Sequence, residues 1–68
     1  MKAKDLVIGN LYVDKYNPKW VCKYVGVKAD GLFKGHYNFV AATSISHGCL
    51  CDDQEIENDM SEFKGELS

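Results

Sequence analysis

The first fifty residues alternate short apolar runs with clusters of Gly, Asn, Pro and Asp. This pattern is typical of β-strands joined by turns. It predicts strands over residues 11–16, 20–27, 36–45 and 49–51. We expect a turn at Asn17-Pro18-Lys19, because proline fixes φ and cannot donate to a β-ladder.

The strand over 20–27 has apolar residues on both faces. Trp20, Cys22 and Tyr24 share one face, and valines dominate the other. A strand of this kind is expected in a small, strongly curved sheet, with a bend at Gly26. The run 28–35 contains Asp-Gly and a further glycine, so we predict a loop there.

After residue 52 the apolar period changes from two to about three and a half. Ile56, Met60, Phe63 and Leu67 are spaced four, three and four apart, which places them on one side of a helix. We predict a helix over 53 to about 64.

The start of this helix carries its own signals. Asp52 or Asp53 is suited to cap it, and Glu55 occupies the acidic position of a capping box. The alternative is one helical turn followed by a fifth strand over 60–67 that closes a barrel.

These elements predict one mainly β domain over residues 1–68. We expect a strongly bent antiparallel sheet or partly open barrel of four or five strands, with a short acidic helix near the C-terminal end. At 68 residues and 46% hydrophobic composition, the chain is close to the smallest size that one core stabilises.

Three segments carry a resemblance: KAKDLVIGNLY (2–12), WVCKYVG (20–26) and HYNF (36–39), followed by the acidic segment around Ile56. Together they resemble small SH3-like or KOW-like β-barrel proteins of the tailed-bacteriophage accessory type. The resemblance implies a non-enzymatic protein that binds a host protein and redirects or inhibits it. It transfers no catalytic residue.

Charge is divided unevenly along the chain. Residues 1–51 hold seven lysines against three acids, a net +4, whereas residues 52–68 hold seven acids against one lysine, a net −6. The acidic face of the predicted helix is either a solubilising surface or a docking surface for a basic partner. The docking hypothesis uses the carboxylates of Glu55, Glu57, Asp59 and Glu62.

Aromatic residues and lysines interleave in the first half. Tyr16, Trp20 and Phe33 lie in or beside predicted loops, so we expect partial exposure and add them to the docking surface. The alternative is a nucleic-acid-binding face that combines Tyr16 and Trp20 with four lysines: Lys15, Lys19, Lys23 and Lys34. The absence of arginine weighs against a dedicated phosphate or base reader.

The motif HGCLC (47–51) places His47, Cys49 and Cys51 at alternate positions. Residues two apart on a strand are separated by about 6.6 to 6.8 Å, too far for tetrahedral zinc unless the chain turns. Paired Cys-x-x-Cys signatures are absent. We therefore expect the cysteines to act as small packing residues, with a metal or redox site as the less favoured alternative.

Enzymatic signatures are weak. Cys22, His36 and His47 are able to meet in the fold, but no nucleophile elbow, orienting group or phosphate loop accompanies them. We expect no catalysis and no cofactor. The odd number of cysteines and the lack of a long apolar run predict a cytoplasmic protein (bacterial host cytoplasm if phage-encoded) without membrane association. We expect a monomer or small homo-oligomer.

Overall fold

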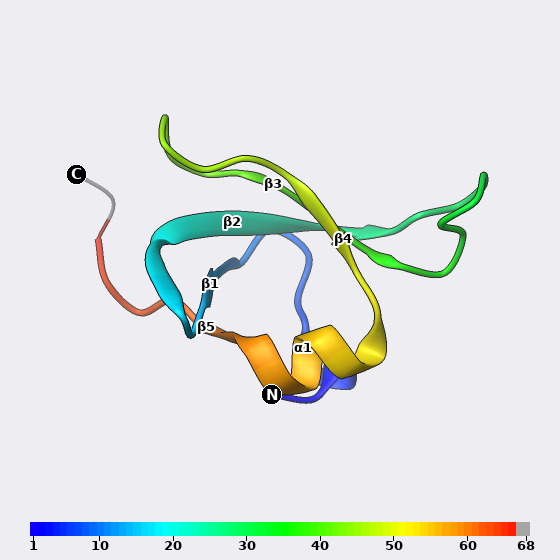
Figure 1. Ribbon diagram of the computed structural model, residues 1–68, viewed down its shortest axis with the longest axis horizontal. Helices are drawn as coiled ribbons and strands as arrows, with labels where there is room; N and C mark the ends of the chain where they lie inside the picture. Colours follow the sequence, from blue (N-terminus) through cyan, green and yellow to red (C-terminus); the bar gives the residue numbers. More distant parts are fainter. Residues whose placement is uncertain (67–68) are drawn as a thin grey trace.

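The computed structural model describes residues 1–66 as five antiparallel strands in one unclosed sheet, with one short α-helix (Figure 1). The strands are β1 (Leu11–Asp14), β2 (Asn17–Val27), β3 (Tyr37–Ala41), β4 (Cys49–Cys51) and β5 (Met60–Glu62). The helices are the 3-10 helix η1 (Ala3–Asp5) and α1 (Asp53–Asp59). The predicted mainly β fold, with its bent open sheet and short acidic helix, is confirmed.

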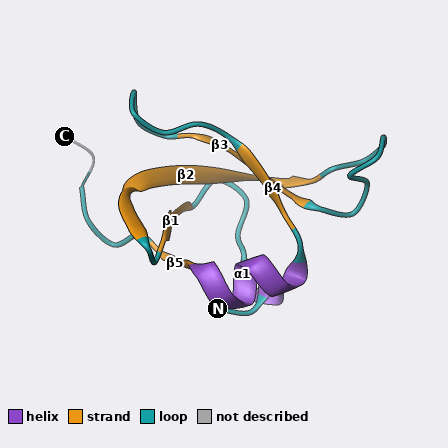
Figure 2. Cartoon of the chain, in the orientation of Figure 1, coloured by secondary structure: helices purple, strands orange, loops and turns teal. Residues whose placement is uncertain are grey.

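Strand order in the sheet is β4-β3-β2-β1-β5. The first four strands form a meander, and α1 then carries the chain from one edge strand, β4, to the other, β5 (Figure 2). The two edge strands are not neighbours, so the described part of the sheet does not close. The register between β2 and β3 shifts at Gly26, where φ is +115°. A bulge therefore lies at the residue where the bend is predicted.

The turn between β1 and β2 lies earlier than predicted. It occupies Lys15 and Tyr16, where the Asp14 Oδ1 atom accepts a hydrogen bond of 2.8 Å from the Tyr16 backbone N–H. The predicted turn at Asn17-Pro18-Lys19 is wrong, because β2 already begins at Asn17. Proline is tolerated there since the β1–β2 register is irregular, with Val13 opposite Val21 but Asp14 opposite Asn17.

The third strand ends at Ala41, four residues before its predicted end. A local turn replaces the rest of it: the Ser46 N–H donates to the Thr43 carbonyl at 3.2 Å, and the two hydroxyl oxygens are 2.7 Å apart. Short polar side chains of this kind compete with a β-ladder for backbone partners.

The predicted helix over 53 to about 64 is wrong beyond residue 59. The chain changes to β5 at Met60, and Tyr12, Val13 and Asp14 of β1 pair with it. The alternative of a short fifth strand is correct for 60–62, but this strand does not close a barrel. Leu67, the last residue of the predicted apolar stripe, lies outside the described residues.

Helix α1 begins as the sequence predicts. Asp52 accepts a hydrogen bond from the Glu55 N–H at 2.8 Å, and the Glu55 carboxylate accepts one from the Asp52 N–H at 3.2 Å. This reciprocal pair is a capping box. No helix within residues 1–66 has the length and apolar character needed to cross a membrane.

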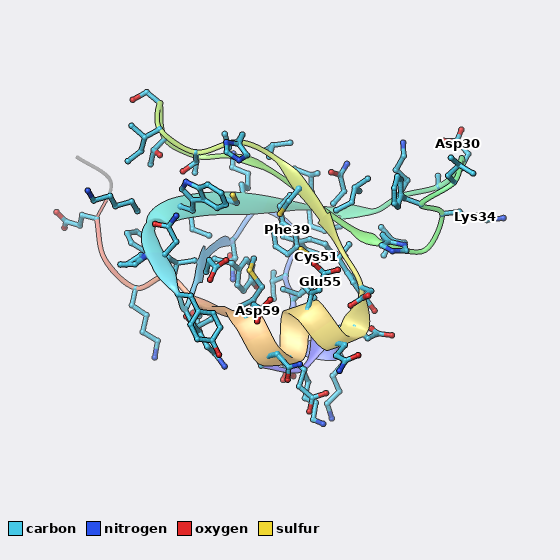
Figure 3. All side chains as sticks on the ribbon, viewed as in Figure 1. Asp30, Lys34, Phe39, Cys51, Glu55 and Asp59 are labelled. Atoms are coloured by element: carbon cyan, nitrogen blue, oxygen red, sulfur yellow. The ribbon has the colours of Figure 1, made fainter. Side chains whose placement is uncertain are left out.

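The core lies between the concave side of the sheet and α1. Its buried residues are Tyr12, Cys22, Tyr24, Phe39, Cys51, Ile56 and Met60. Tyr12 packs its ring edge-on against Phe39, with centroids 6.1 Å apart, and its hydroxyl oxygen accepts a hydrogen bond from the Val7 N–H. Figure 3 shows Phe39 and Cys51 on this inner side of the sheet.

Candidate functional site

A cavity of about 220 Å³ lies between α1 and the strands above it, and we call it the cysteine pocket. All three cysteines of the chain line it: Cys22 from β2, and Cys49 and Cys51 from β4. Three carboxylates also line it: Asp14, Glu55 and Asp59. The remaining lining residues are Trp20, His47 and Met60. Cys51, Glu55 and Asp59 can be followed in Figure 3, where they lie around the space between α1 and the strands.

The cysteine side chains of β4 meet at their sulfur atoms. The Sγ atoms of Cys49 and Cys51 are 3.6 Å apart, although backbone positions two apart on a strand are separated by about 6.6 Å. The expectation that strand spacing keeps these sulfurs apart is therefore wrong. The side chains lean toward each other, because both leave the same face of the strand.

Cys22 joins the two cysteines of β4 from β2, on the other side of β3. Its thiol is buried and contacts the His47 carbonyl oxygen, with Sγ and O 3.5 Å apart. The packing prediction is therefore correct for Cys22 and Cys51, which belong to the core, and wrong for Cys49, which is exposed.

The environment separates the pKa values of the three thiols. The hydrogen bond from the Cys51 thiol lowers the pKa of Cys49, and burial together with the charges of Glu55 and Asp14 opposes that effect. The same hydrogen bond raises the pKa of Cys51, since ionisation would remove the donor, and burial adds to the rise. Burial raises the pKa of Cys22. Cys49 is consequently the thiol that ionises first.

The sulfur cluster does not extend to a metal-binding set. Within residues 1–66, no group of three His, Cys, Asp or Glu side chains is arranged to hold a metal ion. The imidazole of His47 instead packs edge-on against the indole of Trp20, with ring centroids 4.5 Å apart. His36, which the sequence suggests as a catalytic candidate together with Cys22 and His47, lies at the end of the β2–β3 loop against Phe33 and does not line the pocket.

The three carboxylates of the pocket come from two parts of the chain. Glu55 and Asp59 are one helical turn apart on α1, and Asp14 is the last residue of β1. A backbone hydrogen bond of 2.7 Å from Lys15 to the Asp59 carbonyl holds α1 beside the β1–β2 turn. In the described part of the chain, the ion pairs are Lys2–Glu57 and Lys28–Asp30, so no lysine neutralises these three carboxylates.

The other two predicted docking acids lie elsewhere. Glu57 forms an ion pair of 3.1 Å with Lys2, and its carbonyl accepts a hydrogen bond from the N-terminal ammonium group of Met1. Glu62 is exposed on β5. The predicted acidic surface is therefore divided: Glu55 and Asp59 line the pocket, whereas Glu57 and Glu62 do not.

The aromatic residues predicted to be exposed are exposed. Tyr16 is 79% exposed in the β1–β2 turn, Phe33 is 49% exposed in the β2–β3 loop, and Trp20 is 38% exposed. Of these three side chains, Trp20 lines the pocket and the other two do not. The loop that contains Phe33 projects from the end of the sheet marked by Asp30 and Lys34 in Figure 3, well away from Glu55 and Asp59.

The predicted lysine face is scattered. Lys15 lies in the β1–β2 turn and Lys34 in the distant β2–β3 loop. Lys19 and Lys23 belong to β2, and the alternation along the strand turns Lys23 away from the pocket-lining Cys22. The four lysines therefore do not line a common groove with Trp20.

Two pocket residues were not identified from the sequence. The sequence pattern places Asp14 only within a predicted strand and Met60 only on the apolar side of the predicted helix. Their position depends on the β1–β5 pairing, which places Asp14 directly opposite Met60. The acidic residue immediately before an exposed turn was the available signal for Asp14.

No protein-family model, curated protein or solved structure matches this chain. The resemblance to SH3-like and KOW-like phage proteins therefore stays a prediction.

Proposed function

We propose that the protein is a non-enzymatic protein-interaction module that binds a basic segment of a partner protein, with one lysine or arginine side chain entering the cysteine pocket. One observation carries this proposal. Asp14, Glu55 and Asp59 line a single cavity and have no lysine partner in the described residues.

The lining of the pocket suits a long basic side chain. The aliphatic stem of lysine or arginine packs on apolar surface while its charge stays near polar groups. Trp20 and Met60 supply the apolar surface, and the indole also attracts a cation over its face. The cavity of about 220 Å³ is smaller than the ~300 Å³ at which small-molecule sites begin, so it favours a single side chain over a whole metabolite.

The identity of the partner is a separate question from the chemistry of the pocket. A bacterial host protein, and an inhibitory role against it, follow from the resemblance to phage accessory proteins and stay predictions. The nucleic-acid alternative has less support, because the lysines at 15, 19, 23 and 34 are spread over two ends of the sheet.

Binding is testable with the protein's own fluorophore. Trp20 is the single tryptophan of the chain and lines the pocket, so its fluorescence reports occupancy. We expect a lysine- and arginine-rich peptide to change that fluorescence in a saturable, salt-sensitive manner, and an acidic peptide of equal length to leave it unchanged.

Matched variants separate the pocket from general charge attraction. E55Q and D59N each remove one charge inside the pocket, and E57Q removes one charge outside it. We expect each of the first two to raise Kd by about 1.4- to 5-fold, the range of an exposed ion pair, and E57Q to change Kd less. Equal losses in all three variants, or no fluorescence change even at low salt, would refute pocket binding.

A further inference from the structure

The cysteine pocket brings two thiols into contact. The Sγ atoms of Cys49 and Cys51 are 3.6 Å apart, and a disulfide bond is about 2.05 Å long. Both side chains leave the same face of β4 and already point toward each other. A small movement of the two side chains is therefore enough to bring the sulfur atoms to bonding distance.

The backbone of β4 is suited to this movement. Cα atoms two residues apart on a strand lie about 6.4 to 6.8 Å apart, at the upper end of the range of about 4.4 to 6.8 Å that disulfides span. The strand has three residues, and within residues 1–66 it pairs with β3 alone, so no described ladder holds its other side. A slight bend shortens the span, and a bridge of this kind is readily reduced again.

We propose that Cys49 and Cys51 form a thiol–disulfide exchange site for small disulfides of positive or zero charge, with Cys49 as the attacking thiol and Cys51 as the resolving thiol.

The exchange consists of two displacements. The Cys49 thiolate attacks one sulfur of the incoming disulfide, a mixed disulfide forms, and the other half leaves as a thiolate that takes a proton from water. Cys51 then gives its proton to water and attacks the Cys49 sulfur, which expels the second half as a thiolate that also takes a proton from water. The two protein thiols are oxidised, and the incoming disulfide is reduced to two thiols.

The environments of the thiols assign their roles. Cys49 is the exposed cysteine, whereas Cys51 is 6% exposed and Cys22 is 5% exposed. The hydrogen bond from Cys51 also lowers the pKa of Cys49, which favours the attacking thiolate. Cys22 also interacts with Cys49, but its thiol contacts the His47 carbonyl oxygen, whereas the short sulfur–sulfur contact of Cys49 is with Cys51. We therefore assign the resolving role to Cys51.

The carboxylates around Cys49 select the charge of the reagent. Glu55 and Asp14 lie close enough to raise the pKa of Cys49, against the effect of Cys51. The same two charges repel an anionic disulfide and attract a cationic one. This selectivity rests on the carboxylates of the proposed binding pocket, whereas disulfide formation rests on the cysteines alone.

Mass spectrometry of the whole protein tests the exchange. The reduced chain is incubated with cystamine, which is cationic, with hydroxyethyl disulfide, which is neutral, and with oxidised glutathione, which is anionic. We expect the protein to lose two hydrogens, and peptide mapping to show a Cys49–Cys51 bridge with Cys22 as a free thiol. C51S and C51A should both stop at the mixed disulfide on Cys49, and C49S should not form it.

Rates test the charge preference. At low ionic strength we expect cystamine to react about fivefold faster than the neutral hydroxyethyl disulfide, the factor of one unit-charge contact in water, and oxidised glutathione to react more slowly than either. That ratio should fall in E55Q and stay unchanged in E57Q.

Other outcomes overturn the proposal. A stable mixed disulfide in the wild type, a Cys22–Cys49 bridge, or equal reactivity of C49S would exclude the assigned pair. Equal rates for cationic and anionic reagents would overturn the charge preference. Peptide binding is read by Trp20 fluorescence and exchange by mass, so failure of one is distinguishable from failure of the other.

Discussion

Ile56 attaches α1 to the rest of the protein, and its truncation is the most direct test of the fold. Its side chain is 0% exposed, and it is the buried residue of the seven-residue helix. Isolated helices shorter than about 12 residues are marginal in water, so α1 depends on this contact. We therefore predict that I56V, which removes one methylene group from the core, lowers the stability of the whole domain.

The expected magnitude follows from the burial. Truncation of buried isoleucine to valine costs about 0.5 to 1.5 kcal/mol, and truncation to alanine costs about 2 to 5 kcal/mol. At about 0.05 to 0.15 kcal/mol per residue, a chain of 68 residues has a total stability of roughly 3 to 10 kcal/mol. I56A therefore removes a large share of it. I56V leaves the protein folded and lowers Tm by about 2 to 12 °C, at about 4 to 8 °C per kcal/mol.

Urea unfolding followed by Trp20 fluorescence measures the change in the free energy of unfolding. The matched control is I45V, which makes the same chemical change at a side chain that is 60% exposed in the β3–β4 loop. Surface changes of this kind stay within about 0.5 kcal/mol. If I56V costs no more than I45V, α1 does not pack on the sheet as described.

Three further changes test the helix start, a tight backbone contact and a hydrogen bond. D52A removes the acceptor of the Glu55 N–H and should cost about 0.5 to 2 kcal/mol in urea unfolding, whereas D52N keeps an acceptor and should cost less. G48A places a Cβ atom 2.7 Å from the Phe39 carbonyl oxygen, so thermal unfolding should show a loss of about 1 to 3 kcal/mol. The Asp53 carboxylate accepts a hydrogen bond of 2.7 Å from the Tyr37 hydroxyl, and this bond raises the pKa of Tyr37. The bond's contribution to stability is complete below the ordinary tyrosine pKa of about 10 and is lost as pH rises through the raised pKa. D53N should therefore lower the Tyr37 pKa in an ultraviolet titration, with Y37F as the baseline.

Local sequence signals predicted the elements that depend on local chemistry. The capping box of Asp52 and Glu55 uses residues three apart, and the structure contains both of its hydrogen bonds. The bulge at Gly26 follows from a residue that adopts positive φ without strain. Each of these features is determined by a few neighbouring residues, so an isolated stretch of sequence is sufficient to predict it.

The ends of two elements depended on distant partners instead. The stripe of Ile56, Met60 and Phe63 fits a longer helix, yet Met60 is buried as the first residue of β5. Pairing with β1 satisfies the backbone of 60–62, and helical spacing alone contains no information about an available strand edge. The pocket has the same origin, because Asp14 reaches Glu55 and Asp59 only through this pairing.

The cysteines show a different limit of spacing arguments. The distance of about 6.6 to 6.8 Å between alternate strand positions describes the backbone, whereas the chemistry depends on the sulfur atoms. Two side chains on one face can converge by several ångströms, and here they reach 3.6 Å. The position of Cys22 beside them depends on the curvature of the whole sheet.

Glu55 shows why the charge of this pocket must be altered with care. The same carboxylate that lines the cavity accepts the hydrogen bond from the Asp52 N–H at the start of α1. Charge reversal by E55K would remove the cap together with the charge, and any loss of binding would then report a shifted helix as well as a lost contact. Glutamine fills the same position of a capping box. E55Q therefore changes the electrostatics while α1 keeps its start, and D52N provides the complementary case, in which the cap changes outside the pocket lining. Binding that falls in E55Q and persists in D52N would assign the effect to the carboxylate charge itself.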